Sequence, residues 1–332
     1  MADRPLISIA LCTYNGARYI REQLDSLVNQ TFSSFEVVAV DDCSTDGTLD
    51  ILDEYARADS RIRVIRNAHN LGFRANFERA LSLTSASLIA PCDQDDVWLP
   101  EKLQLLLDAL GEHALAYSDS EFVDARGRPL GLAMSDKSRL IDIDDPAVFA
   151  AGNCVSGHSM LFRRILLERA LPVPDCFYYD WWIAAVAASS GGVVYRPEKL
   201  VKYRLHDSNV TNVLRSRPVK RRQGYRLQQL RDFQLRVEYL ASLPGQSRCF
   251  LERLHELWSK REQRWLSPSL AYFIYRHAPR IFALRKPRRS RFKYASKYVF
   301  GLRLKRITNS FGYTEPAAAK SAANGGRMAP LR

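Results

Sequence analysis

The chain has 332 residues, of which 46% are hydrophobic and 26% are charged, and these proportions exclude an intrinsically disordered protein. Its formal net charge of +13 is unevenly distributed: residues 213–332 contain 28 Lys and Arg against 6 Asp and Glu, whereas residues 1–212 contain 21 against 30. The acidic first part argues against a nucleic-acid-binding core, so we expect no nucleic-acid partner and two parts with different roles.

The N-terminal stretch lacks a signal-peptide pattern, and no segment reaches the roughly 20 apolar residues needed to span a bilayer. The six cysteines form no CxxC pair and no cluster with the spacing of a zinc site. We therefore expect a cytoplasmic protein with reduced thiols. The basic second part would also suit a peripheral position on the cytoplasmic face of the inner membrane.

Hydrophobic periodicity predicts strands and helices that alternate through the first third of the chain. The expected strands are residues 6–12, 35–40, 61–65 and 87–91, and the expected helices are 18–30, 47–58, 73–83 and 101–110. Such alternation is typical of a parallel sheet covered by helices, with ligands bound at the carboxyl ends of the strands. Each strand is followed by a polar cluster, namely Thr13–Asn15, Asp41-Asp42, Asn70–Gly72 and Asp93–Asp96. These four clusters should therefore meet at one edge of one sheet.

The cluster Asp93-Gln94-Asp95-Asp96 is a candidate cation site. Carboxylates crowded on one loop repel one another unless a cation neutralises them, and carboxylate oxygens are the ligands that Mg²⁺ and Mn²⁺ prefer. A diphosphate at the strand ends would complete such a site. The alternative is that Asp96 caps the following helix while the other two carboxylates face solvent.

Three further positions are candidates for chemistry. Asp41 and Asp42 could accept hydrogen bonds from a base or a ribose, or could shape the turn that precedes a helix. Asp180 lies among tyrosines and tryptophans, where desolvation would raise the pKa of its carboxyl group and make it a better base. The alternative is that Asp180 is the N-cap of a helix at 181–189. His206 is either a third metal ligand or a solvated loop histidine.

The later part of the chain changes character. We expect strands at 114–118, 157–163, 193–196 and 199–205, a hairpin at 121–130, helices at 164–170 and 179–189, and a helix pair at 221–242 and 247–266. Residues 268–308 interleave aromatic residues with Lys and Arg, which is the composition of an interfacial membrane segment. The alternatives are a solvated basic face and RNA binding. We thus divide the chain into a catalytic domain (1–212), a basic helical extension (213–310) and a disordered tail (311–332).

Four sequence motifs in the first part resemble glycosyltransferase family 2 and its Rossmann-like GT-A fold: ISIALCTYNG, VAVDDCSTDGT, NLGFRANFERAL and APCDQDDVW. The later motifs GNCVSGHSMLFR, YYDWWIAAVAAS and VKYRLHDSNVT resemble the rhamnosyltransferase-like bacterial members of that family. Together the motifs span about residues 5–213. The resemblance implies an α/β fold with a mostly parallel sheet flanked by helices.

The resemblance also implies an inverting, metal-dependent transfer of a sugar, with rhamnose as the candidate, from a nucleotide-diphosphate donor. The acceptor would be a glycan or a lipid-linked saccharide of bacterial surface polysaccharide synthesis. The motif that holds the family's general base falls on Tyr179-Asp180, where the first residue departs from the usual acid, so Asp180 would be the base.

The remaining roles follow from the same motifs. Nucleotide contacts fall on Thr13, Tyr14, Asn15, Asp41, Asp42, Asn70 and Asp93, with Asp41 favoured for the base. Ligands for Mn²⁺ or Mg²⁺ fall on Asp95, Asp93 and His206, with Asp95 favoured as the direct ligand. Contacts to the acceptor or the sugar fall on Trp181, Trp182 and Asp96.

Other functions are less well supported. A sugar nucleotidyltransferase would carry a Gly-rich phosphate loop with a lysine after the first strand, and CTYNGARY lacks it. A dehydrogenase would show GxGxxG after the first strand, and this motif is absent there. An inactive sugar-nucleotide-binding scaffold would not need to keep Asp93, Asp95 and Asp180.

Overall fold

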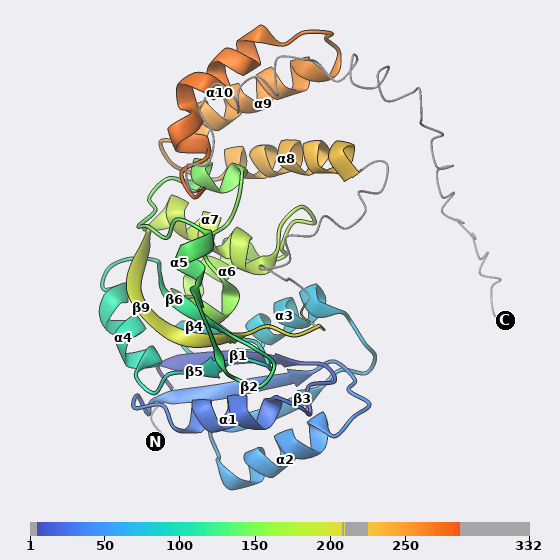
Figure 1. Cartoon of the computed structure of the whole chain (residues 1–332), viewed down its shortest axis with the longest axis vertical. Helices are drawn as coiled ribbons and strands as arrows, with labels where there is room; N and C mark the ends of the chain where they lie inside the picture. The colour runs from blue at the N-terminus through green and yellow to red at the C-terminus, as the bar shows by residue number, and fades with distance from the viewer. Residues whose placement is uncertain (1–4, 208, 210–224, 286–332) are drawn as a thin grey trace, which may run out of the picture.

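The computed structural model of the protein describes residues 5–207, 209 and 225–285 (Figure 1). The first third contains β1 (Ile7–Thr13), α1 (Ile20–Val28), β2 (Phe35–Asp41), α2 (Thr48–Ala58), β3 (Ile62–Arg66), α3 (Phe73–Ser82), β4 (Leu88–Cys92), β5 (Val97–Trp98) and α4 (Lys102–Leu110). The middle contains β6 (Leu115–Val123), β7 (Pro129–Ala133), α5 (Met134–Lys137), β8 (Met160–Arg163), α6 (Leu167–Ala170), α7 (Tyr179–Ser190) and β9 (Val193–Arg204), with 3-10 turns at Pro146–Ala150, Gly157–Ser159 and Arg164–Leu166. Three helices follow, α8 (Tyr225–Ser242), α9 (Arg248–Glu262) and α10 (Pro268–Ile281).

The strands and helices predicted for the first third are all present, with ends shifted by a few residues. Later predictions needed more correction. The two late strands expected at 193–196 and 199–205 are one continuous strand, β9, and the strand expected at 157–163 begins as a 3-10 turn. The short strand β5 was not predicted, because two residues are too few to show a periodicity.

Nine strands of the described residues form one sheet in the order β3-β2-β1-β4-β8-β6-β9-β5, with β7 paired to β6. The pairs β1–β2, β1–β4 and β2–β3 are parallel, as the alternation of strands and helices predicts. Beyond β4 the sheet is mixed, since β8 runs antiparallel to β4 and β6, while β9 is parallel to β6. The sheet curls around the middle of the molecule (Figure 1).

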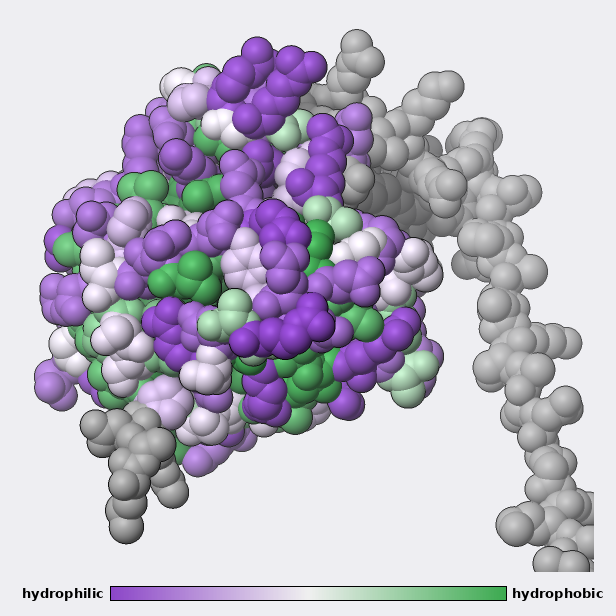
Figure 2. Space-filling view, turned by 90° about the horizontal axis from the view of Figure 1, so that it is seen from below, coloured by the Kyte–Doolittle hydropathy of each residue, from purple (hydrophilic) through white to green (hydrophobic). Residues whose placement is uncertain are grey.

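Each face of the parallel strands is covered by a separate apolar core, because every residue of β1 is buried and successive side chains point to opposite faces. On one face Ile7, Ile9 and Leu11 pack with α1, α2 and α4. On the other face Ala10 and Cys12 pack with α3 and α7. Seen from the side of α1 and α2, the outer surface is mostly hydrophilic with scattered apolar side chains, as expected of amphipathic surface helices (Figure 2).

The helices α8, α9 and α10 stack at the end of the molecule opposite α1 and α2 (Figure 1). Within the described ranges, no helix combines the length and the apolar character needed to cross a bilayer. The predicted helix pair is present as α8 and α9. Residues 213–224 and 286–310 of the predicted extension, and the tail 311–332, lie outside the described residues.

Asp145 joins α9 and α10 to the rest of the molecule. Its carboxylate accepts hydrogen bonds from Ser247 Oγ at the start of α9, from Arg280 Nε in α10 and from the backbone N–H of Ala147. Burial alone would raise the pKa of Asp145, but the hydrogen bonds from Arg280 and Ser247 outweigh it and hold the pKa below its usual value. The backbone of Arg139 adds a bond of 3.0 Å to the carbonyl oxygen of Leu284, just beyond α10.

Replacing Asp145 with Ala should lower the free energy of unfolding at pH 7 by about 1–3 kcal/mol, because Arg280 and Ser247 lose their shared acceptor. Urea unfolding followed by circular dichroism measures this loss, and the exposed neighbour Asp144→Ala serves as the control. Since the folded pKa of Asp145 is lowered, its contribution is present at neutral pH and is lost as the pH falls below about 4. Equal unfolding curves for the two variants at pH 7 would contradict this role.

Candidate functional site

A cavity of about 460 Å³ opens where the carboxyl ends of β1, β2 and β4 meet. Seven of the residues predicted for the site line it: Thr13, Tyr14, Asp42, Asn70, Asp93, Asp95 and Asp180. Residues that were not predicted complete the wall, among them Phe73, Phe77, Met134, Ser156, His158, Tyr178, Tyr179 and Tyr203. The four polar clusters identified in the sequence therefore do meet at one edge of the sheet.

The two acids that end β2 face different ways. Asp41 is fully buried, and its carboxylate accepts hydrogen bonds from Thr13 Oγ1 at 2.9 Å and from the backbone N–H and hydroxyl of Ser44. Asp42 borders the cavity and accepts from the backbone N–H groups of Leu71 and Gly72 at 2.7 and 2.8 Å. The prediction favoured Asp41 for the nucleotide base, but Asp41 faces the protein interior and Asp42 is the acid at the cavity wall.

Gln94, the middle residue of the acidic loop, ties that loop to the end of β1. Its Oε1 accepts from the backbone N–H of Tyr14 at 2.8 Å, and its Nε2 donates to the Tyr14 carbonyl oxygen at 3.0 Å. A Cβ at Gly16 would lie 2.2 Å from Gln94 Oε1, so the amide needs the glycine. Asn15, which follows Tyr14 in the chain, has a positive φ of 48°, and its Oδ1 accepts a hydrogen bond from the backbone N–H of Thr45. Asn15 thus shapes the loop, whereas the Tyr14 ring, 49% exposed, borders the cavity.

Asp95 and His206, two of the three residues predicted as metal ligands, lie side by side, and Asp95 lines the cavity. His206 Nε2 lies 2.8 Å from Asp95 Oδ2, although the two residues are far apart in the sequence. Arg204, at the end of β9, fixes the relative position of the two loops, because its Nε donates to the carbonyl oxygen of Asp95 at 2.8 Å and its guanidinium lies against Tyr19 and Glu22.

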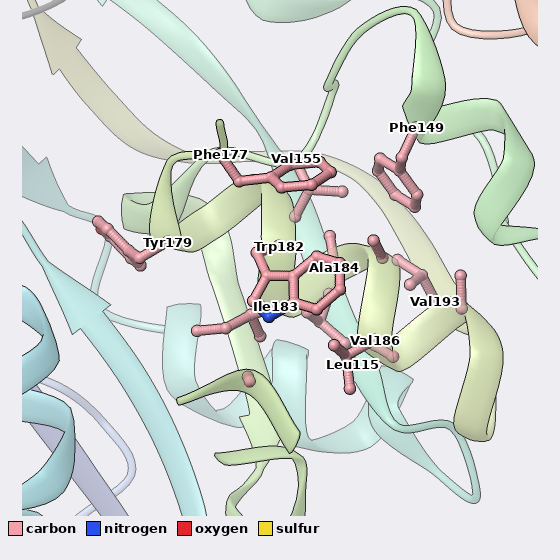
Figure 3. Close-up of a cluster of buried hydrophobic side chains, with 14 of the residues drawn as sticks. Leu115, Phe149, Val155, Phe177, Tyr179, Trp182, Ile183, Ala184, Val186 and Val193 are labelled. Carbon is pink, nitrogen blue, oxygen red and sulfur yellow. The ribbon is translucent and has the colours of Figure 1, made fainter. Parts of the chain in front are cut away.

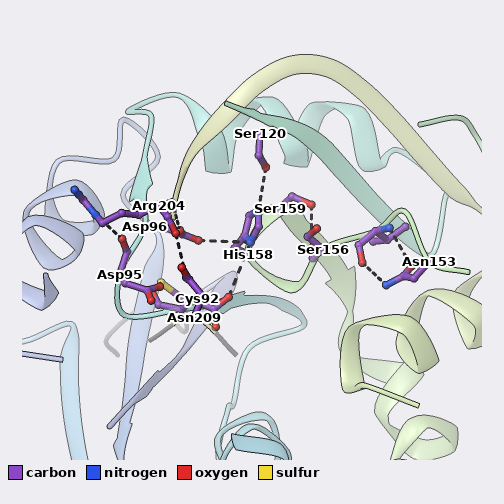
Figure 4. A network of polar contacts seen from close by, with 12 residues as sticks. Cys92, Asp95, Asp96, Ser120, Asn153, Ser156, His158, Ser159, Arg204 and Asn209 are labelled. Atoms are coloured by element: carbon purple, nitrogen blue, oxygen red, sulfur yellow. Dashed lines mark hydrogen bonds and ion pairs between the residues drawn. The ribbon is translucent and has the colours of Figure 1, made fainter. Parts of the chain in front are cut away.

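A second group consists of Asp93, Asp96 and His158, of which Asp96 and His158 are buried and His158 was missed by the sequence analysis (Figure 4). His158 Nδ1 lies 3.5 Å from Asp96 Oδ2 and 4.0 Å from Asp93 Oδ2, while its Nε2 lies 2.9 Å from Ser120 Oγ. One ligand atom from each of Asp93, Asp96 and His158 falls within 4.8 Å of the others. Asp96 is fully buried and accepts from the backbone N–H of Arg204, so it does not face the cavity where an acceptor or sugar contact was predicted.

Burial and mutual repulsion shift the pKa values of these groups. Burial first, and then the charges of Asp95 and Asp180, raise the pKa of Asp93 to about 8. Burial lowers the pKa of His158 to about 3, with a smaller contribution from Lys102. Full ionisation of these groups is therefore disfavoured, and a proton or a cation would relieve their repulsion. Carboxylate oxygens and imidazole nitrogens are suitable ligands for Mn²⁺ or Mg²⁺, so the residues present fit such an ion.

Asp180 lies at the first turn of α7 and also lines the cavity. Its Oδ1 accepts from the backbone N–H of Trp181 at 2.7 Å. Burial raises the pKa of Asp180 to about 6, although the backbone N–H groups of Trp181 and Gly157 partly oppose the shift. A carboxylate with this pKa can accept a proton near neutral pH.

The two tryptophans after Asp180 do not line the cavity, where sugar stacking was predicted for them. Trp182 is 4% exposed and packs in the apolar core beside Phe177 (Figure 3). Trp181 Nε1 donates to the carbonyl oxygen of Phe149, and the guanidinium of Arg236 in α8 lies 4.8 Å from the ring centroid. Both rings are turned to the core and to α8 because α7 is apolar on nearly all sides and eight of its twelve residues are buried.

Aromatic residues at the cavity come instead from the other side of Asp180. Tyr178 is 50% exposed, and Tyr179 is buried with its ring stacked on Phe77 at a centroid distance of 4.2 Å. Phe73 contacts both Phe77 and Tyr179 and is itself 37% exposed. The motif YYDWW thus supplies an aromatic wall through its tyrosines.

Comparisons with known proteins agree with this geometry. Residues 8–170 match the family described as Glycosyl transferase family 2. An uncharacterized glycosyltransferase of Haemophilus influenzae is 27% identical over 237 residues, which cover 64% of this chain and 69% of that protein. The putative teichuronic acid biosynthesis glycosyltransferase TuaG of Bacillus subtilis is 36% identical over 115 residues, covering 35% of this chain and 46% of that protein.

The fold also has a solved counterpart. S. aureus TarS 1-349, in complex with UDP-GlcNAc, superposes with a TM-score of 0.56 and 20% identity, covering 82% of this chain and 72% of that chain. This likeness confirms the GT-A fold predicted from the sequence. Residues 8–170 form a glycosyltransferase family 2 domain, and the predicted enzyme class, a glycosyltransferase, is confirmed.

The close approach of Gly157 to Tyr179 allows a test of whether Tyr179 positions Asp180 at the first turn of α7. A Cβ at this position would lie 1.9 Å from the hydroxyl oxygen of Tyr179, and Tyr179 cannot retreat because it is stacked on Phe77. Gly157→Ala should therefore displace the first turn of α7 and lower the rate of nucleotide release from a sugar donor by at least about tenfold. A Cβ at Gly152 meets nothing within 4 Å, so Gly152→Ala is the matched control. Equal rates for the two variants would show that Tyr179 does not set the geometry of Asp180.

Proposed function

We propose, with this glycosyltransferase family 2 domain as the premise, that the chain transfers a sugar from a nucleotide-diphosphate donor to an acceptor hydroxyl with inversion at the anomeric carbon. The observation that carries the proposal is the single cavity that Asp93 and Asp95 share with Asp180. Acids at the strand ends line this cavity together with a carboxylate that has a raised pKa. This arrangement suits a leaving diphosphate beside the strand-end acids and an incoming hydroxyl beside Asp180.

The nucleotide would occupy the side of the cavity formed by the ends of β1 and β2. Thr13 and Tyr14 come from the first strand end, and Asp42 and Asn70 come from the next two polar clusters. Support comes from the Tyr14 ring, which offers an aromatic face to a base, and from the backbone groups that Asp42 holds at Leu71 and Gly72. Asp93 would complete the donor contacts beside the diphosphate.

A divalent cation, Mn²⁺ or Mg²⁺, would be held by Asp95 and His206, with Asp93 beside it. When bound, the cation supplies positive charge that stabilises the departing diphosphate. The 2.8 Å contact between Asp95 and His206 supports this assignment, because it brings a nitrogen ligand next to an oxygen ligand that lines the cavity. The buried group of Asp93, Asp96 and His158 is the competing position for a cation.

Asp180 would act as the general base. Its carboxylate takes the proton of the acceptor hydroxyl while the hydroxyl oxygen forms a bond to the anomeric carbon. The bond from that carbon to the diphosphate oxygen breaks, and the electron pair leaves with the nucleotide. The raised pKa of Asp180 supports this role, since a base with a pKa of about 6 is ionised at neutral pH and still accepts a proton well.

The donor sugar would be a 6-deoxyhexose such as rhamnose. Support comes from the apolar part of the wall, where Phe73, Phe77 and Met134 could contact a methyl group in place of a hydroxymethyl group. The acceptor would be a growing surface glycan or a lipid-linked saccharide, in line with the teichuronic acid synthesis named for the relative TuaG. A lipid-linked acceptor would bring the enzyme to the cytoplasmic face of a membrane.

Asp180→Asn should reduce transfer by at least about a thousandfold while leaving the dissociation constant of the donor nearly unchanged, because the amide cannot accept the proton. For the wild-type enzyme, kcat should fall as the pH drops through about 6, since protonation removes the base. Product formation measures the first effect and donor titration calorimetry the second. The exposed Asp53→Asn is the control, and normal turnover of Asp180→Asn would rule out this base.

Removing the cation with a chelator should abolish transfer, and Mn²⁺ or Mg²⁺ should restore it. Asp95→Asn and His206→Ala should each raise the Mn²⁺ concentration for half-maximal activity by at least about tenfold, whereas the exposed His69→Ala should leave it unchanged. A larger effect of His158→Ala than of His206→Ala would assign the cation to the buried group instead. Full activity in the chelator would contradict metal dependence.

A further inference from the structure

The helix α10 has an outward-facing stripe of aromatic and cationic residues. Its inner side is formed by apolar residues that pack against the rest of the molecule: Leu270, Ala271, Ile274, Ala278 and Ile281. On the opposite side, residues 272, 275, 276 and 279 follow helical spacing, and Tyr272 and Tyr275 are 69% and 46% exposed. The turn before α10 adds Leu266, which is 53% exposed. We call Arg264, Leu266, Tyr272, Tyr275 and Arg276 the outer α10 face.

The charge of this face has one sign. No Asp or Glu occurs between Gln263 and Thr314, a stretch that contains thirteen Lys and Arg. Arg264 and Arg276 are exposed, and neither forms a salt bridge within the described part of the chain. Arg280, in contrast, faces inward and pairs with Asp145. The face therefore combines positive charge with amphipathic rings, and it lies in the part of the chain farthest from α1 and α2 (Figure 1).

Two occupants could cover such a face. A second copy of the chain would bring two positively charged faces together, and their repulsion disfavours that pairing. A bilayer with anionic lipids complements the face in both respects, because tyrosine rings occupy the headgroup region and arginines meet lipid phosphates. Leu266, at the exposed turn, would reach into the acyl boundary.

We propose that the outer α10 face is the surface by which the protein docks on an anionic lipid bilayer. This inference deepens the proposed function, since a lipid-linked acceptor would be met at such a surface. Docking here is reversible, because the face offers a few rings and two arginines and does not offer a spanning segment. The position of the surface on α10 ties it to the catalytic domain through Arg280 and Asp145.

Sedimentation with phosphatidylglycerol vesicles tests the proposal on the full chain, without any sugar donor. The wild type should bind these vesicles at low salt and should bind phosphatidylcholine vesicles weakly. The double variant Tyr272→Ser/Tyr275→Ser should bind at least about fivefold more weakly, and Arg264→Glu/Arg276→Glu should lose at least about fivefold for each reversed arginine. Leu130→Ser in β7 and Arg57→Glu in α2 are the matched controls, because both residues are exposed and lie outside this face.

Wild-type binding by the double variants would overturn the proposal, as would equal binding of the wild type to both kinds of vesicle. A change in oligomeric state caused by Tyr272→Ser/Tyr275→Ser in the absence of lipid would show that a second copy covers the face and would also overturn it. Donor turnover without lipid should be the same in all these variants, so a failure of docking can be distinguished from a failure of the proposed transfer reaction.

Discussion

The parallel pairing of β1 with both β2 and β4 is the constraint on which the site depends. In this register Thr13 lies opposite Asp41, and Leu11 lies opposite Cys92, so three strands end at the same edge of the sheet. The residues that follow these strands are therefore brought together although long stretches of chain separate them. The hydrogen bond from Thr13 to Asp41 and the amide of Gln94 on the Tyr14 backbone then fix the loops relative to one another.

The same arrangement sets the electrostatics of the cavity. Three carboxylates follow β4, and burial first, then the charge of Asp95, raises the pKa values of Asp93 and Asp96. The carboxylates remain close together despite their repulsion, because hydrogen bonds of Arg204 and of the residues around His158 hold the loop in place. A cation or a proton would relieve this repulsion.

Much of the first half could be predicted, because alternating apolar runs and polar strand ends encode both the parallel sheet and the position of its ligand edge. Asp42 was placed at the cavity in this way, whereas Asp180 was singled out by its aromatic neighbours, and both residues line the cavity. His158 was missed because it lies in an apolar segment that was expected to be a plain strand, and only the antiparallel insertion of β8 between β4 and β6 brings it behind Asp96. Trp182 was misassigned because a sequence motif does not reveal which side of a largely buried helix faces the core. Asp41 and Asp42 face different ways because Asp41 is hydrogen-bonded to Ser44 and Asp42 to the loop before α3. No local sequence pattern predicts these bonds.

A crystal structure with Mn²⁺ and a nucleotide-sugar that the enzyme hydrolyses would test the central claim most directly, namely that the strand-end acids and the α7 carboxylate serve one reaction. The account predicts the diphosphate against Asp93 and Asp95, the base beside Tyr14 and Asp42, and the anomeric carbon turned toward Asp180. A donor bound outside this cavity, or held with its anomeric carbon facing away from Asp180, would contradict the account.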